Sequence, residues 1–319
     1  MGNPCVLSMP MLPENWNTQG PTSTKTQSSP CNKPDMPHPL LYAWPGQETL
    51  AAKVSALADL RPCHLSMRNF PDGETYVRVD TNVRDCVVYL LVSLDRPDIK
   101  FLPLYFMAQT LKAQGAAAVC LIAPYLCYMR QDKQFKPGEC VSAEQFALLL
   151  GHTVDELITV DPHLHRHQRL EELYSIPCTT LHAAPVIAAW LTEHIPTAVL
   201  VGPDEESKQW VAGVAECAGV PYMHLLKTRL ADRDVRIEAP DAGRWLNRRP
   251  VLVDDILSTG KTLLEATRVL HEAGYRDPAC IAVHGIFAGD AFAELRQVGL
   301  DLYTSDSVSH ETNAFSSLR

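Results

Sequence analysis

The sequence predicts an α/β protein with two domains, each built from a mostly parallel β-sheet flanked by helices. Three observations support this fold class. Apolar, β-branched runs of strand length alternate with segments of helical periodicity, as in parallel sheets that are covered on both faces. Polar clusters follow several of these runs directly, where α/β proteins build their sites. The chain has 319 residues, which is enough for two domains of ordinary size.

The composition is that of a soluble globular protein, with 46% hydrophobic and 20% charged residues. The net charge of −9 argues against a general nucleic-acid-binding protein, which would usually be basic. No apolar run is long enough to span a membrane. Ten cysteines are scattered without zinc or redox spacing, and no secretory signal is recognisable. We therefore expect a cytoplasmic protein with neither a nucleic-acid nor a membrane partner.

Residues 1–38 are rich in Pro, Ser, Thr and Asn and lack periodicity, which predicts a disordered tail. A wrongly assigned start codon is the alternative. The expected N-terminal domain covers residues 39–177. Its strands are expected at 41–43, 64–70, 76–80, 87–94, 117–124 and 157–160. Its helices are expected at 48–60, 99–114 and 142–151, the last opened by a capping box of Ser142 and Gln145.

The same alternation continues over residues 178–305, the expected C-terminal domain, and a C-terminal segment follows over 306–319. Helices are expected at 184–194, 207–218, 262–273 and 290–297. Strands are expected at 198–201, 221–226, 251–256, 280–287 and 301–304. Residues 228–249 are polar and carry six arginines without a clear period. Two α/β domains in one chain indicate a site between them, at the carboxyl ends of strands.

The strongest functional signal runs from Val251 to Thr262. An apolar strand ends in two carboxylates, a loop of small and hydroxyl residues follows, and a helix begins. Backbone N–H groups at a helix N-terminus favour a phosphate, whereas buried carboxylates need partners and suit hydroxyls. A P-loop would require glycine at position 255, which is Asp. The pattern predicts a sugar-phosphate site made of Asp254, Asp255, Ser258, Thr259, Gly260, Lys261 and Thr262.

Further polar clusters stand at the ends of expected strands, at 69–74, 124–139, 161–169, 202–207 and 226–229. Taken alone, each fits an ordinary turn, a solvated loop or a helix cap. The arginine, lysine, amide and aromatic groups of 124–139 would also suit phosphates and a base. The histidines at 163, 165 and 167 invite a zinc interpretation, but no nearby carboxylate or thiol completes a closed tetrahedral set.

Taken together and in this order, the clusters resemble those of the PRPP synthetase (ribose-phosphate pyrophosphokinase) family, over about residues 40–306. The stretch from Val251 to Thr262 resembles the phosphoribosyl-binding motif, which phosphoribosyltransferases share. The other motifs are typical of PRPP synthetases. They are Phe70-Pro71-Asp72-Gly73-Glu74, Arg130-Gln131-Asp132-Lys133, Asp161-Pro162-His163, Pro203-Asp204 and Lys227-Thr228-Arg229. The resemblance implies two phosphoribosyltransferase-like domains, with the nucleotide side first and the ribose 5-phosphate side second.

The resemblance also implies an activity. Diphosphate would pass from ATP to the C1 hydroxyl of ribose 5-phosphate, giving PRPP and AMP, in a homo-oligomer built from dimers. The residues that would hold the nucleotide are Phe70, Asp72, Glu74, Arg130 and Gln131.

The remaining implied roles concern the metal, the catalytic loop and the sugar. His163 and Asp204 would position Mg²⁺. Lys227 and Arg229 would stabilise the transferring diphosphate, since positioning and charge neutralisation dominate such reactions. The residues at the ribose hydroxyls would be Asp254 and Asp255, and those at the 5-phosphate Ser258, Thr259, Gly260, Lys261 and Thr262.

Two departures mark the chain as a divergent member of such a family. Glu205 and Glu206 follow Pro203-Asp204 where the family usually has glycine, which adds negative charge beside the implied metal site. The basic run at Lys133 also lacks the family's second arginine. The alternatives are a phosphoribosyltransferase that consumes PRPP, which would not need the Arg130 and Lys227 clusters, and a catalytically silent regulatory subunit, which Lys227 argues against.

Overall fold

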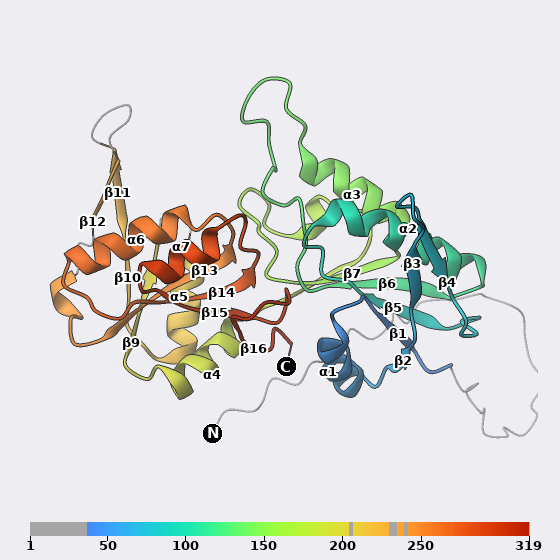
Figure 1. Ribbon diagram of the computed structural model, residues 1–319, viewed down its shortest axis with the longest axis horizontal. Helices are drawn as coiled ribbons and strands as arrows, with labels where there is room; N and C mark the ends of the chain where they lie inside the picture. Colours follow the sequence, from blue (N-terminus) through green and yellow to red (C-terminus); the bar gives the residue numbers. More distant parts are fainter. Residues whose placement is uncertain (1–36, 204–206, 230–234, 239–241, 319) are drawn as a thin grey trace, which may run out of the picture.

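The computed structural model describes residues 37–203, 207–229, 235–238 and 242–318. Most of the tail expected over 1–38 lies outside these residues, and so do Asp204, Glu205 and Glu206. Two six-stranded sheets organise the described chain. Figure 1 shows them in two lobes that lie side by side, with blue to green elements in one lobe and yellow to red elements in the other.

The N-terminal sheet has the strand order β2-β1-β5-β6-β7-β8, and every neighbouring pair is parallel. Its strands are β1 (Leu40–Ala43), β2 (Arg61–Cys63), β5 (Val87–Leu91), β6 (Ala118–Ala123), β7 (Glu156–Val160) and β8 (Cys178–Leu181). Its helices are α1 (Glu48–Ala58), α2 (Pro97–Ala113) and α3 (Ser142–Thr153), with a short 3₁₀ turn at Leu170–Glu172. A separate antiparallel hairpin joins β3 (Ser66–Asn69) to β4 (Thr75–Arg78).

The C-terminal sheet has the order β10-β9-β13-β14-β15-β16 and is parallel throughout. Its strands are β9 (Ala198–Gly202), β10 (Tyr222–His224), β13 (Arg249–Leu257), β14 (Ala279–Gly285), β15 (Asp301–Ser305) and β16 (Asn313–Phe315). Its helices are α4 (Ala184–His194), α5 (Lys208–Ala218), α6 (Lys261–Glu272) and α7 (Ala291–Gln297), with a 3₁₀ turn at Ala242–Arg244. The antiparallel hairpin of β11 (Leu226–Arg229) and β12 (Val235–Glu238) extends away from this lobe (Figure 1).

Burial explains why the central strands could be predicted from the sequence. All seven residues of β14 are buried, and so are Val251–Val253 in β13. Strands covered on both faces are apolar throughout, which the sequence displays directly. Helix α6 buries Leu263, Ala266 and Leu270, a spacing of three and four residues that places them on one helical face. Among the described residues, no helix combines the length and the apolar character that a membrane crossing requires.

Strands β2, β8, β12 and β16 were not predicted from the sequence, because each is short or polar. Strand β2 contains three residues at a sheet edge, and β8 is half polar. The expected strand over 221–226 is two strands, β10 and β11, and β12 lies within the arginine-rich segment. Strand β8 pairs with β7, so the first sheet continues beyond residue 177, the expected domain boundary.

The capping box expected at the start of α3 is wrong. The helix begins at Ser142 itself, and the residue in the N-cap position is Val141, which makes no side-chain cap. The Ser142 hydroxyl instead donates to Oε1 of Gln131, at 3.1 Å. The Ser142 hydroxyl therefore bonds to a residue outside the helix, Gln131, and does not cap the helix end.

The two lobes are joined by a buried polar contact at His284 in β14. The His284 ring is 1% exposed and packs against Tyr125, with the ring centroids 5.0 Å apart. Its Nε2–H donates to the Val160 carbonyl of β7 at 3.1 Å, which leaves Nδ1 to accept from the Ser307 hydroxyl at 2.8 Å. Burial lowers the pKa of His284 below its usual value, so the neutral ring is favoured.

Substituting His284→Gln is expected to lower the free energy of unfolding by about 1–3 kcal/mol near neutral pH, because buried partners are left unpaired. The loss should shrink as pH falls from about 7.5 to about 5. A histidine with a lowered folded-state pKa stabilises the fold above its unfolded-state pKa, and this stabilisation fades in acid. Denaturant unfolding at several pH values measures it, with the exposed His152→Gln as control. A pH-independent difference would contradict the prediction.

Candidate functional site

A cavity of about 420 Å³ lies between the two lobes, at the carboxyl ends of the strands. Its walls come from the segments that follow β7, β8 and β13, from the beginnings of α5 and α6, and from Arg130 in the loop after β6. Parallel strands bring their carboxyl ends to one edge of a sheet, and this cavity lies where two such edges face one another.

The two carboxylates at the end of β13 lie on one wall of the cavity, and both are half-buried. The Asp255 N–H donates to Oδ1 of Asp254 at 3.0 Å. Oδ2 of Asp255 accepts from His163 Nδ1 at 2.5 Å, across the two domains. Burial alone would raise the pKa of Asp255, but the hydrogen bond from His163 and the electrostatic interaction with its ring hold this pKa below its usual value. Asp255 is therefore an anion in the cavity wall.

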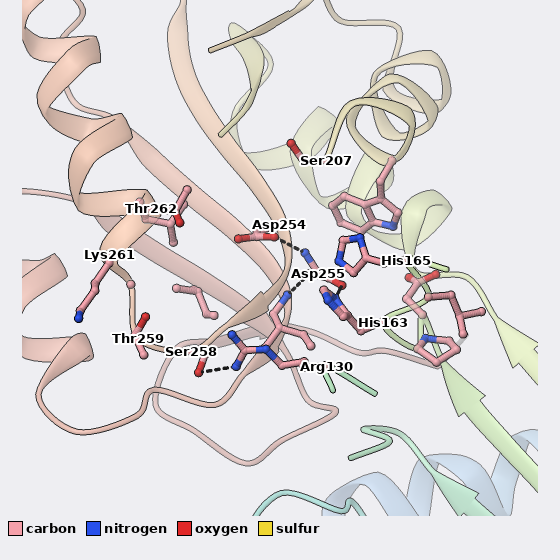
Figure 2. A pocket seen from close by; sticks show the side chains of 18 of the residues that line it. Arg130, His163, His165, Ser207, Asp254, Asp255, Ser258, Thr259, Lys261 and Thr262 are labelled. Atoms are coloured by element: carbon pink, nitrogen blue, oxygen red, sulfur yellow. Dashed lines mark hydrogen bonds and ion pairs between the residues drawn. The ribbon is translucent and has the colours of Figure 1, made fainter. Parts of the chain in front are cut away.

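The loop after β13 has the shape that an anion site requires. Gly260 adopts a left-handed conformation with φ of +70° and stands in the N-cap position of α6. The first intrahelical bond runs from the Leu264 N–H to the Gly260 carbonyl at 2.9 Å, so the N–H groups of the first turn have no partner within the helix. Figure 2 shows Ser258, Thr259 and Thr262 around this turn, with Lys261 extending away from the carboxylates.

Arg130 is the one member of the expected nucleotide set that contributes to the described cavity walls. Its Nη1 donates to the Ser258 hydroxyl at 3.0 Å, which connects the N-terminal domain to the loop after β13 (Figure 2). Gln131 faces α3 instead, where its side chain accepts from Ser142. The other three expected residues lie on the exposed β3–β4 hairpin, outside this cavity: Phe70, Asp72 and Glu74.

The expected metal and catalytic residues are only partly described. His163 lies in the cavity beside His165, with the ring centroids 3.9 Å apart. Lys227 and Arg229 belong to β11, and their side chains lie outside the described part of the structure, as does Asp204.

The cavity also contains a histidine–carboxylate pair that the sequence did not reveal. His182 Nδ1–H donates to Oδ1 of Asp161 at 2.9 Å, and the Ala183 N–H donates to Oδ2 at 2.8 Å. The hydrogen bond to Asp161 raises the pKa of His182, which is 72% exposed. Asp161 was visible as the end of a strand, whereas His182 follows β8, which was not recognised. Trp210, one turn into α5, lines the same wall and carried no sequence signal.

The donor set determines what cation this site fits. Within the described ranges, no three His, Cys, Asp or Glu side chains are grouped as a metal site of their own. His163 donates Nδ1–H to Asp255, so its Nε2 keeps a free lone pair, the arrangement of a metal-binding histidine oriented by a carboxylate. A few oxygen and nitrogen donors suit a hard cation that takes its remaining ligands from substrate phosphates and water.

Comparisons with known proteins agree with this geometry. A family described as the N-terminal domain of ribose phosphate pyrophosphokinase matches residues 40–153, and the phosphoribosyl transferase domain family matches residues 179–314. A ribose-phosphate pyrophosphokinase of Saccharolobus solfataricus is 35% identical over 239 residues, covering 72% of this chain and 79% of the relative. One from Methanothermobacter thermautotrophicus is 31% identical over 278 residues, covering 84% and 93%.

Among solved structures, phosphoribosylpyrophosphate synthetase from Mycobacterium smegmatis matches with a TM-score of 0.75 and 26% identity, over 87% of this chain and 92% of that one. The match spans both lobes and confirms the expected pair of phosphoribosyltransferase-like α/β domains. The carboxylate pair of β13 and the loop that follows it, the order of the motifs and these relatives lead to one conclusion: the chain belongs to the ribose-phosphate pyrophosphokinase family.

Proposed function

We propose that this protein is a ribose-phosphate diphosphokinase, which transfers diphosphate from ATP to the C1 hydroxyl of ribose 5-phosphate to give PRPP and AMP. The observation that carries the proposal is one cavity in which an anionic carboxylate pair adjoins a helix N-terminus. Carboxylates suit the ribose hydroxyls, and the free N–H groups at the start of α6 suit the 5-phosphate. A new bond forms between O1 and the β-phosphorus while the bond from this phosphorus to the bridging oxygen of AMP breaks, and the proton of the O1 hydroxyl is released.

In this reaction the protein's residues position the sugar and neutralise charge. Asp254 and Asp255 hold the ribose hydroxyls, and the residues of the phosphate loop hold the 5-phosphate: Ser258, Thr259, Gly260, Lys261 and Thr262. Arg130 adds positive charge beside Ser258, 3.0 Å from its hydroxyl. Lys227 and Arg229 on the β11–β12 hairpin are assigned to the transferring diphosphate, where charge develops.

Mg²⁺ is the metal that this assignment calls for, and His163 and Asp204 would hold it together with substrate oxygens. The free Nε2 of His163 supports this role. When bound with ATP, Mg²⁺ neutralises charge on the phosphates.

We also assign the β3–β4 hairpin, with Phe70, Asp72 and Glu74, to the nucleotide site of a neighbouring copy in a homo-oligomer built from dimers. The hairpin is exposed and lies outside the described cavity of its own chain. The neighbouring helix α2 leaves the apolar side chains of Ile99 and Leu102 exposed. The free thiols of the described cysteines favour a reducing cytoplasm as its location.

One assay tests the function. Purified protein is mixed with ATP, Mg²⁺ and ribose 5-phosphate, and formation of AMP and PRPP is followed, with an Asp255→Asn variant as control for contaminating enzymes. We expect equal amounts of both products, and a large loss with the variant. If no AMP is released under varied metal and phosphate, the synthetase assignment is wrong. Consumption of PRPP with a free base would favour a phosphoribosyltransferase.

A further inference from the structure

Two side chains of the N-terminal domain reach across the cavity to the C-terminal domain. Arg130 donates to Ser258 in the phosphate loop at 3.0 Å, and His163 donates to Asp255 at 2.5 Å. The two come from different loops, which follow the neighbouring strands β6 and β7. Figure 2 shows both contacts beside the ribose 5-phosphate motif. The shape of the cavity therefore depends on how these two loops are held relative to each other.

An ion pair between Arg166 and Asp132 joins the loop after β6 to the loop after β7. Arg166 Nη1 donates to both carboxylate oxygens of Asp132, at 2.7 and 2.9 Å. The Asp132 side chain is only 5% exposed, whereas that of Arg166 is 44% exposed. Burial alone would raise the pKa of Asp132, but Arg166 lowers it below its usual value. A carboxylate this buried depends on its partner, so the pair is unlike a solvated surface bridge.

The ion pair closes a circuit of contacts through both domains. Asp132 is two residues from Arg130, and Arg166 is three residues from His163. Three contacts make up the circuit: His163 with Asp255, Arg166 with Asp132, and Arg130 with Ser258. Short stretches of backbone join one contact to the next, since Ser258 also lies three residues from Asp255.

We propose that Asp132 and Arg166 form a positioning pair, which fixes Arg130 and His163 against the phosphate loop and so sets the affinity for ribose 5-phosphate. The inference rests on the proposed function of the cavity. Neither residue is among those that line the described cavity. The pair acts through the two residues that cross the cavity, Arg130 and His163.

Breaking the pair tests this. Arg166→Met and Asp132→Asn are each expected to raise KM for ribose 5-phosphate about 5- to 20-fold, with kcat changed by less than about 3-fold. The double variant should be no worse than the poorer single variant, because the second change removes nothing further. Arg166→Lys, which keeps the charge, should recover part of the affinity even where Arg166→Met folds poorly.

The matched control is Lys112→Met, which breaks another ion pair of the same domain, Lys112 with Asp155 at 2.8 Å, away from the cavity. KM should not change with this variant. Thermal unfolding and calorimetric binding of ribose 5-phosphate are measured on all variants. A lowered unfolding temperature with KM unchanged, or additive effects in the double variant, would overturn the proposal. If the wild type forms no PRPP, the function itself is wrong; if it is active and the variants match the control, only the positioning pair is wrong.

Discussion

Lys227→Ala is expected to lower kcat by about 10²- to 10³-fold while changing KM for ribose 5-phosphate by less than about 3-fold. Lys227 lies in β11, in a hairpin that extends from the C-terminal lobe (Figure 1). The proposed sugar site lies elsewhere, at the end of β13 and the start of α6. A positive charge brought to the transferring diphosphate acts mainly in the transition state, so its loss lowers turnover more than binding.

Steady-state kinetics with ribose 5-phosphate and ATP varied in turn measure this separation. Thr228→Ala, one residue along the same strand, is the control for damage to the hairpin, and it should keep most of the activity. A parallel loss of turnover and ribose 5-phosphate affinity in Lys227→Ala would indicate that the lysine binds the ground state. A kcat near the wild-type value in Lys227→Ala would show that Lys227 has no catalytic role.

The β13 segment could be predicted from sequence because each of its parts obeys a local rule. A strand buried on both faces is apolar, the residue in the turn before α6 must tolerate a positive φ, and α6 has an apolar face of helical period. Two carboxylates directly after such a strand indicate a site, because burial requires that they have partners. None of these inferences needed contacts from elsewhere in the chain.

The contacts that complete the cavity have no such local signal. His163 and Asp255 are 92 residues apart, and Arg130 and Ser258 are 128 residues apart. A motif singled out His163, but its carboxylate partner Asp255 was assigned to the sugar hydroxyls and not to the histidine. His182 was missed because β8 is too polar to be read as a buried strand. Only the pairing of whole strands brings these groups together.

Gly260→Ala is expected to destabilise the protein by about 2–4 kcal/mol and to raise KM for ribose 5-phosphate about 10-fold. Gly260 has a φ of +70°, which alanine rarely adopts. An added Cβ would lie 2.9 Å from Cδ1 and 3.2 Å from Cγ of the buried Leu295 in α7. To relieve the crowding, the turn must move, and the N–H groups proposed to bind the 5-phosphate would move with it.

The variant Gly289→Ala serves as a control that has the backbone strain of a positive φ without the crowding by Leu295. Gly289 has a similar φ of +61°, but nothing lies within 4 Å of its added Cβ, so this variant should lose only about 1 kcal/mol. Denaturant unfolding of both variants gives the difference due to Leu295. That difference should shrink in a Leu295→Val background, because valine lacks the Cδ1 atom that crowds the turn. If Gly260→Ala is no more destabilising than Gly289→Ala, the contact with Leu295 does not constrain the phosphate loop.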